Sequence, residues 1–102
     1  MDVRYSAASL KEYWDAVAHY DSESIELGDR FMAAFDKAIQ DIKEAPDRFA
    51  KAGARVRRHD LDRFPYGIVY LFADNILRII AVAHHKRRPY YWRKRLRDIE
   101  DN

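Results

Sequence analysis

Residues 66–85 constrain the fold of this chain more than any other stretch. They hold two apolar segments, Y-G-I-V-Y-L-F and I-L-R-I-I-A-V-A-H-H, separated by the turn-forming residues Ala73-Asp74-Asn75. Each segment has the length of a strand and is rich in Val, Ile, Tyr and Phe, which is typical of central strands covered on both faces. Asp and Asn tolerate the left-handed backbone that a tight turn requires. The stretch therefore predicts a β-hairpin with its turn near Asp74-Asn75.

The residues before the hairpin predict one short strand and one amphipathic helix. Val3 and Tyr5 alternate with polar residues, which indicates a half-buried edge strand over residues 2–5. Ser6 is a typical helix N-cap. The apolar residues that follow recur at helical spacing, which predicts a core-facing stripe made of Leu10, Tyr13, Trp14, Val17 and Tyr20.

A second helix follows after the polar segment 21–26. Its apolar stripe is Leu27, Phe31, Ala34, Phe35, Ala38, Ile39 and Ile42. Pro46 ends the helix, while Gly28 disfavours its first turn, so we expect it to begin near Asp29. A loop this short predicts two antiparallel helices.

The remaining segments complete an α+β fold. Residues 47–54 predict a loop anchored by Phe49, and residues 55–62 predict an edge or half-exposed strand. Pro89 fits the first turn of a helix with Trp92, Leu96 and Ile99 on one face. Because helices and strands are segregated in sequence, we predict one domain over residues 1–102. In it an antiparallel sheet, made of the N-terminal strand and three C-terminal strands, packs against an antiparallel helical hairpin, with a short C-terminal helix.

Charge is distributed unevenly along the chain. Residues 1–54 hold 7 Lys or Arg and 11 Asp or Glu (7 − 11 = −4), whereas residues 55–102 hold 12 and 6 (12 − 6 = +6). A basic half interleaved with aromatics predicts a surface for a polyanion or an acidic partner, or otherwise a solvated face. The chain has no cysteine and no apolar run approaching ~20 residues. We therefore expect a cytoplasmic protein with no membrane contact.

Several motifs, in this order, resemble those of a known superfamily. They are A-P-D-R-F near residues 45–49, V-R-R-H-D-L-D-R-F-P-Y-G-I-V-Y over residues 56–70, and A-V-A-H-H-K-R-R-P-Y-Y-W over residues 81–92. They are similar to those of RelE/ParE superfamily toxins of type II toxin-antitoxin modules, over nearly the whole chain. The resemblance implies a toxin that forms a hetero-oligomer with a cognate antitoxin, which fills a groove of the toxin. It also implies one of two targets, since RelE-like members cleave messenger RNA on the ribosome and ParE-like members poison DNA gyrase.

The residues favour the ParE-like alternative. RNA cleavage requires several cations and an acid or base. By resemblance the ribonuclease set would be Arg57, Lys86, Arg87 and Tyr91, but Gly67 stands where such enzymes have an arginine. The predicted function is therefore a toxin that binds gyrase. A ribosome-dependent ribonuclease and a non-toxic binding module remain alternatives.

The predicted target-binding residues lie in the basic half. They are Arg57, Arg58, Arg63, His85, Arg87, Arg88 and Tyr90. Guanidinium groups bind carboxylate and phosphate alike, so the same residues could face acidic residues of the antitoxin. His84 and His85 point to opposite faces of a strand, so at most one of them can enter a given site. Neither belongs to a zinc-like spacing, and we expect no metal and no cofactor.

Overall fold

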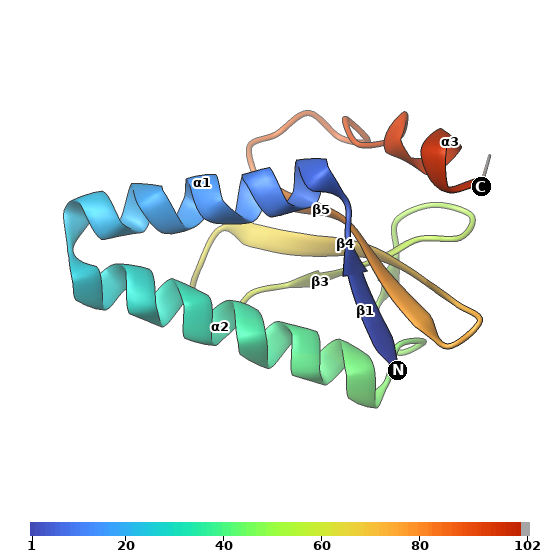
Figure 1. Cartoon of the computed structure of the whole chain (residues 1–102), viewed down its shortest axis with the longest axis horizontal. Helices are drawn as coiled ribbons and strands as arrows, with labels where there is room; N and C mark the ends of the chain where they lie inside the picture. Colours follow the sequence, from blue (N-terminus) through green and yellow to red (C-terminus); the bar gives the residue numbers. More distant parts are fainter. Residues whose placement is uncertain (101–102) are drawn as a thin grey trace.

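The computed structural model describes residues 1–100, which form two layers around a sheet (Figure 1). Helices α1 (Ala7–Glu23) and α2 (Ile25–Glu44) make an antiparallel pair, and a short helix α3 (Arg95–Glu100) ends the described chain. The strands are β1 (Asp2–Tyr5), β2 (Ala50–Lys51), β3 (Arg57–Asp60), β4 (Tyr66–Ala73) and β5 (Ile76–His84). The predicted α+β class is thus confirmed.

The sheet differs from the prediction in two details. Its strand order within the described residues is β1-β5-β4-β3-β2, so it has five strands rather than four. The extra strand, β2, lies in the predicted loop 47–54 and pairs with β3, which is therefore not the edge. Strand β1 runs parallel to β5, whereas the other pairs are antiparallel.

The predicted hairpin is confirmed at its turn. Ala73 pairs with Ile76, which leaves a turn of Asp74 and Asn75. Both residues have positive φ, 55° and 59°, as a tight hairpin turn with a right-handed twist requires. Asp and Asn therefore stand here because they tolerate this conformation.

Asn75→Val is expected to lower the free energy of unfolding by about 1–2 kcal/mol, because a β-branched residue is poorly tolerated at positive φ. Urea denaturation of the purified protein measures the change. Asn75→Gly is the matched control and should stay near the wild-type stability. Equal stability of the valine and glycine variants would contradict the turn geometry.

The two long helices are joined more tightly than the sequence indicated. Only Ser24 separates them, and its side-chain oxygen accepts a hydrogen bond from the Leu27 N–H (3.1 Å). The expected start near Asp29 is wrong, because α2 begins at Ile25 and includes Gly28. Gly28 is buried against the side chain of Asp21, where an added Cβ would collide. Glycine therefore allows the two helices to approach closely instead of delaying the second one.

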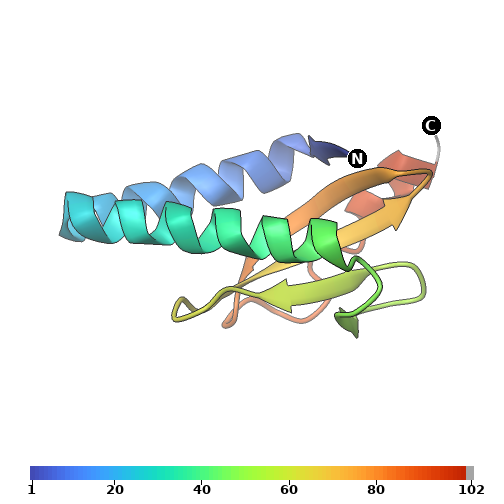
Figure 2. The same cartoon turned by 90° about the horizontal axis from the view of Figure 1, so that it is seen from below.

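The helical pair covers one face of the sheet (Figure 2). Phe31 is fully buried at the centre of this core, and Tyr13 and Phe35 pack with ring centroids 4.6 Å apart. The predicted stripe on α1 is only partly right, since Leu10 and Trp14 are 42% and 57% exposed. Helix α1 instead buries the small residues Ser9 and Ala16, together with Val17.

The C-terminal segment covers the opposite face, where Trp92 is buried among residues of β4 and β5. Leu96 and Ile99 pack against the same cluster, as predicted. The helix does not begin at Pro89, because Tyr90 has a φ of 60° that a right-handed helix excludes. Residues 88–94 form successive tight turns before α3 begins at Arg95.

Candidate target-binding surface

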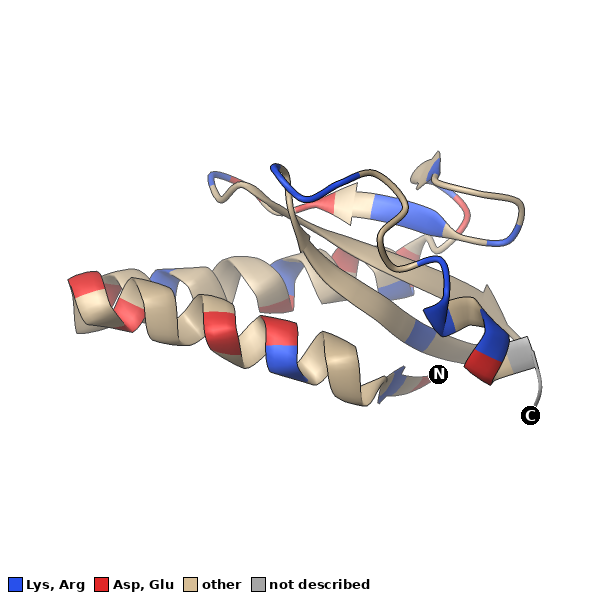
Figure 3. Cartoon of the chain, turned by 90° about the horizontal axis from the view of Figure 1, so that it is seen from above, with Lys and Arg blue, Asp and Glu red and all other residues tan. Residues whose placement is uncertain are grey.

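A basic segment leaves the sheet at the end of β5 and crosses the face opposite the helical pair. We call residues 85–94 the tail, and we call its five cationic side chains the basic tail residues: Lys86, Arg87, Arg88, Arg93 and Lys94. The tail begins with a turn in which the Arg87 N–H donates to the His84 carbonyl oxygen (3.0 Å). Figure 3 shows these cations following one another along the tail. All five side chains are exposed.

Glu12 of α1 holds the tail against α1 through hydrogen bonds to its carboxylate. Its carboxylate, only 15% exposed, accepts hydrogen bonds from the Tyr91 hydroxyl (2.6 Å) and from the Arg95 guanidinium (2.7 and 3.0 Å). It also accepts the Val82 N–H of β5 (3.1 Å). Charge-assisted bonds of this kind are stronger than neutral ones. They join Glu12 to Tyr91 and Arg95, which follow it in the sequence by 79 and 83 positions.

The same network closes an open edge of the sheet. Strand β1 pairs with β5 only over residues 76–79, after which β5 has no neighbouring strand on that side. There the Ile80 carbonyl oxygen accepts from Arg95 (3.0 Å), and the Val82 N–H donates to Glu12. Two side chains thus satisfy backbone groups that a further strand would otherwise bind.

Tyr91 is held as a neutral phenol. Burial, followed by its hydrogen bond to the Glu12 carboxylate, raises the pKa of Tyr91 far above its usual range. The Arg87 guanidinium stacks over the Tyr91 ring, 3.8 Å from its centroid. Tyr91 is therefore a fixed support for Arg87.

An ion pair occupies the space beside Gly67, the position where the ribonucleases have an arginine. Arg58 and Asp60 pair at 2.9 Å, and a Cβ at Gly67 would lie 2.4 Å from atoms of both side chains. Arg58 also donates to the Ala83 carbonyl oxygen (3.3 Å), and His85 lies 3.5 Å from Asp60. The space of a residue-67 side chain is thus filled by Arg58 and Asp60.

The structure does not bring the whole predicted ribonuclease set together. Arg57 lies opposite Tyr70 on β4 and faces the helical layer, where it donates to the Phe49 carbonyl oxygen (2.8 Å). Lys86, Arg87 and Tyr91 belong to the tail, where Arg87 and Tyr91 lie beside α1 at the edge of β5. The four residues therefore do not surround one point.

The predicted target-binding residues divide in a similar way. Arg58 and His85 lie together beside Gly67, and Arg87, Arg88 and Tyr90 lie in the tail. Arg63, with a φ of 68°, lies in the β3–β4 loop and lines a groove along α2. Figures 2 and 3 both place this loop at the same end of the molecule as the start of the tail.

The two adjacent histidines have different surroundings, as their alternation on the strand predicts. His84 Nδ1 accepts the Lys86 N–H (3.0 Å), and its ring packs edge-on against Tyr66. Burial, then the charges of Lys86, His85 and His19, lower the pKa of His84 and so disfavour its charged form. Within residues 1–100 no three His, Asp or Glu side chains are grouped so that they could hold a metal ion.

Glu12, Asp60 and Arg95 were missed by reasoning from sequence. Glu12 carries a weak signal, since it lies with Ser9 and Ala16 at spacings of three and four on the buried side of α1. Small residues on both sides of a carboxylate indicate a close approach of another element. No pattern indicates that Arg95 is that partner, because their contact depends on how the tail folds back.

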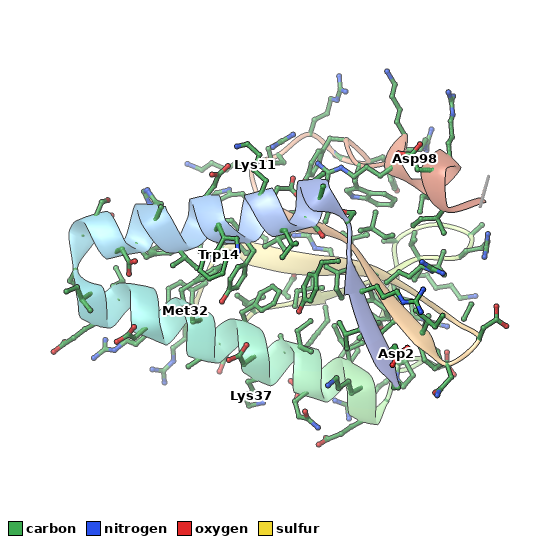
Figure 4. All side chains as sticks on the ribbon, in the orientation of Figure 1. Asp2, Lys11, Trp14, Met32, Lys37 and Asp98 are labelled. Carbon is green, nitrogen blue, oxygen red and sulfur yellow. The ribbon has the colours of Figure 1, made fainter. Side chains whose placement is uncertain are left out.

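A second surface lies beside β1 and holds the exposed side chains of Leu10 and Trp14 of α1. A shallow groove of about 210 Å³ is lined by Tyr5, Leu10, Tyr13, Trp14, Phe35 and Asp36. In Figure 4 Trp14 lies between α1 and α2. Strand β1 has no partner on its outer side, so an apolar groove and a free strand edge adjoin.

Comparison with known proteins gives a match to a family model and matches to solved structures. A family model described as ParE toxin of type II toxin-antitoxin system, parDE, matches residues 3–89. A solved structure titled "Chromosomal ParDE TA system from P. aeruginosa" superposes with a TM-score of 0.70 over 82% of this chain and 95% of that chain, at 12% identity. This structural similarity shows that the two chains share a fold. No curated protein sequence matches this chain. No helix among the described residues is long and apolar enough to span a bilayer.

Proposed function

Because the chain belongs to the ParE toxin family of type II toxin-antitoxin systems, we propose that it arrests growth by binding DNA gyrase and that a cognate antitoxin neutralises it. One observation carries the first half of this proposal. Within residues 1–100 none of the five basic tail residues forms an ion pair with a carboxylate, although other surface cations such as Lys11 and Lys37 do. An exposed cationic segment of this kind attracts an acidic macromolecular surface and accelerates encounter with it.

The geometry supports binding over RNA cleavage. Tyr91 would have to release its proton as a general acid, but that proton is donated to Glu12 and the pKa of Tyr91 is raised. Arg57 lies on the other face of the sheet, and Arg58 and Asp60 fill the space of a residue-67 side chain. A ribosome-dependent ribonuclease therefore remains the second candidate, with Lys86 and Arg87 as its exposed cations.

A supercoiling and cleavage-complex assay with purified toxin and gyrase tests the proposal. We expect the wild type to inhibit supercoiling, and we expect Arg87→Glu with Arg88→Glu to lose inhibition by at least about tenfold, because charge reversal repels an acidic target. The matched control is Arg30→Glu with Lys43→Glu, which makes the same charge change on α2. This control should inhibit like the wild type.

Two other results would reverse the proposal. Toxin that leaves gyrase unaffected but cuts messenger RNA on ribosomes would establish the ribonuclease. Continued growth of cells that express the toxin without antitoxin would count against both activities and favour a non-toxic binding module.

For the antitoxin we propose the groove beside β1 as the docking site. An apolar groove next to a free strand edge accepts an added strand or helix, with side-chain pockets providing specificity. We propose in addition that acidic residues elsewhere in the antitoxin face the basic half of the toxin. Salt and charge reversal at Arg57, Arg58 and Arg87 should weaken the copurified complex, and insensitivity to both would rule out this electrostatic part.

A further inference from the structure

We propose that the tail binds single-stranded nucleic acid, with backbone phosphates on the basic tail residues and one base stacked on Tyr90. This goes beyond gyrase binding, since it assigns a ligand to the tail itself and does not require gyrase to be present. The ligand is defined by its chemistry: a flexible polyphosphate backbone that carries unpaired aromatic bases.

The charge of the tail is the first observation. Residues 85–95 hold six Lys or Arg and no Asp or Glu, and only Arg95 among these six is paired with a carboxylate of the described chain. The remaining five form two groups, residues 86–88 and residues 93–94, on either side of the uncharged residues 89–92 (Figure 3). A phosphate backbone places negative charges at regular intervals along the tail and releases its counterions on binding.

The conformation of Tyr90 is the second observation. Its side chain is 53% exposed and its φ is 60°, which is rare for a bulky residue and costs free energy. The structure maintains this conformation because the next residues are fixed, Tyr91 by Glu12 and Trp92 by burial. The strain therefore displays an aromatic ring that a glycine or asparagine turn would not provide.

The surroundings of Tyr90 complete a stacking platform. The Arg93 guanidinium lies over the ring at 5.3 Å from its centroid, and Trp92 packs edge-on at 6.0 Å. Aromatic rings beside a cationic groove are how proteins bind single strands without sequence preference, since every base has a π-face. A duplex hides these faces in its stack, and an acidic peptide without aromatic residues offers no ring to stack. The combination thus favours an unpaired strand over both.

Fluorescence anisotropy of the full-length toxin with labelled (dT)12 tests this inference. Tyr90→Asn tolerates positive φ but removes the ring, so it should lower affinity about 5- to 150-fold. Its melting temperature should equal or exceed that of the wild type. Tyr90→Phe keeps the ring and should bind like the wild type. Lys94→Ala should instead reduce the slope of log affinity against log salt by about 0.7.

Further arms of the experiment decide between ligand classes. A (U)12 arm shows whether RNA is bound as well as DNA, and a 12-base-pair duplex should bind more weakly than (dT)12. The inference is overturned if Tyr90→Asn binds (dT)12 as tightly as the wild type, or if polyglutamate of equal charge competes as well as (dT)12. The anisotropy assay contains no gyrase. A toxin that fails to inhibit supercoiling could therefore still bind (dT)12, so the two proposals are tested separately.

Discussion

Glu12→Ala is expected to lower the free energy of unfolding by about 3–5 kcal/mol, the cost of breaking a buried ion pair by removing one partner. The substitution leaves the Arg95 guanidinium, 24% exposed, without its carboxylate. It also removes the acceptor of the Val82 N–H and of the Tyr91 hydroxyl. Each buried polar group left without a partner adds its own desolvation cost.

Chemical denaturation followed by circular dichroism measures the effect of the Glu12 variants. Asp15→Ala, on the same helix, removes an exposed carboxylate that pairs only with Lys11, so its change should stay within about 0.5 kcal/mol. Glu12→Gln keeps a side-chain oxygen as acceptor and adds a donor. Its free energy of unfolding should lie between those of Glu12→Ala and Asp15→Ala. If Glu12→Ala and Asp15→Ala were equally stable, the network would not hold the tail.

A second substitution distinguishes the buried charge from the lost contacts. In the Glu12→Ala background Arg95→Leu removes the uncompensated guanidinium, so the double variant should be more stable than Glu12→Ala alone. The contacts of Tyr91 and Val82 with Glu12 stay broken in both variants. Recovery therefore reports the cost of the unpaired charge of Arg95, reduced by the loss of its hydrogen bond to the Ile80 carbonyl oxygen.

The fold was largely predictable because its strongest signals are local. The hairpin follows from two apolar segments and from Asp74-Asn75, and the helical pair follows from Ser6 and the apolar stripe that ends before Pro46. Local signals failed where close packing decided the outcome. The sequence pattern predicts that Gly28 delays the start of the second helix. In the structure Gly28 lies inside that helix and leaves room for the side chain of Asp21.

The candidate site was only partly predictable because it depends on contacts distant in sequence. The exposed cations and Tyr90 follow from composition, yet the sequence does not show that Arg57 faces the helical layer while Arg87 rests on Tyr91. Which face a strand residue takes depends on register. The pairing of Glu12 with Arg95 joins positions 83 residues apart, and no periodicity reports it. The tail is therefore defined by tertiary structure.

The proposed docking of the antitoxin beside β1 would cover Trp14. Burying an aromatic side chain of this size is worth more than most other contacts in an interface, yet here 57% of it remains in water. Leu10, 42% exposed, lies in the same groove. The sequence pattern predicted a buried stripe, and antitoxin binding would complete that burial.

Trp14→Ala is accordingly expected to weaken antitoxin binding about 30- to 1,000-fold, the range of an aromatic anchor worth 2–4 kcal/mol. Titration calorimetry with purified antitoxin measures this loss. Ile25→Ala removes a side chain that is 76% exposed at the junction of the helices, outside the groove, and should bind like the wild type. Trp14→Ala should still inhibit gyrase, because Trp14 lines the groove beside β1, whose lining includes no residue of the tail. If Ile25→Ala weakened the complex and Trp14→Ala did not, the antitoxin would have to dock at the end of the helical pair instead of beside β1.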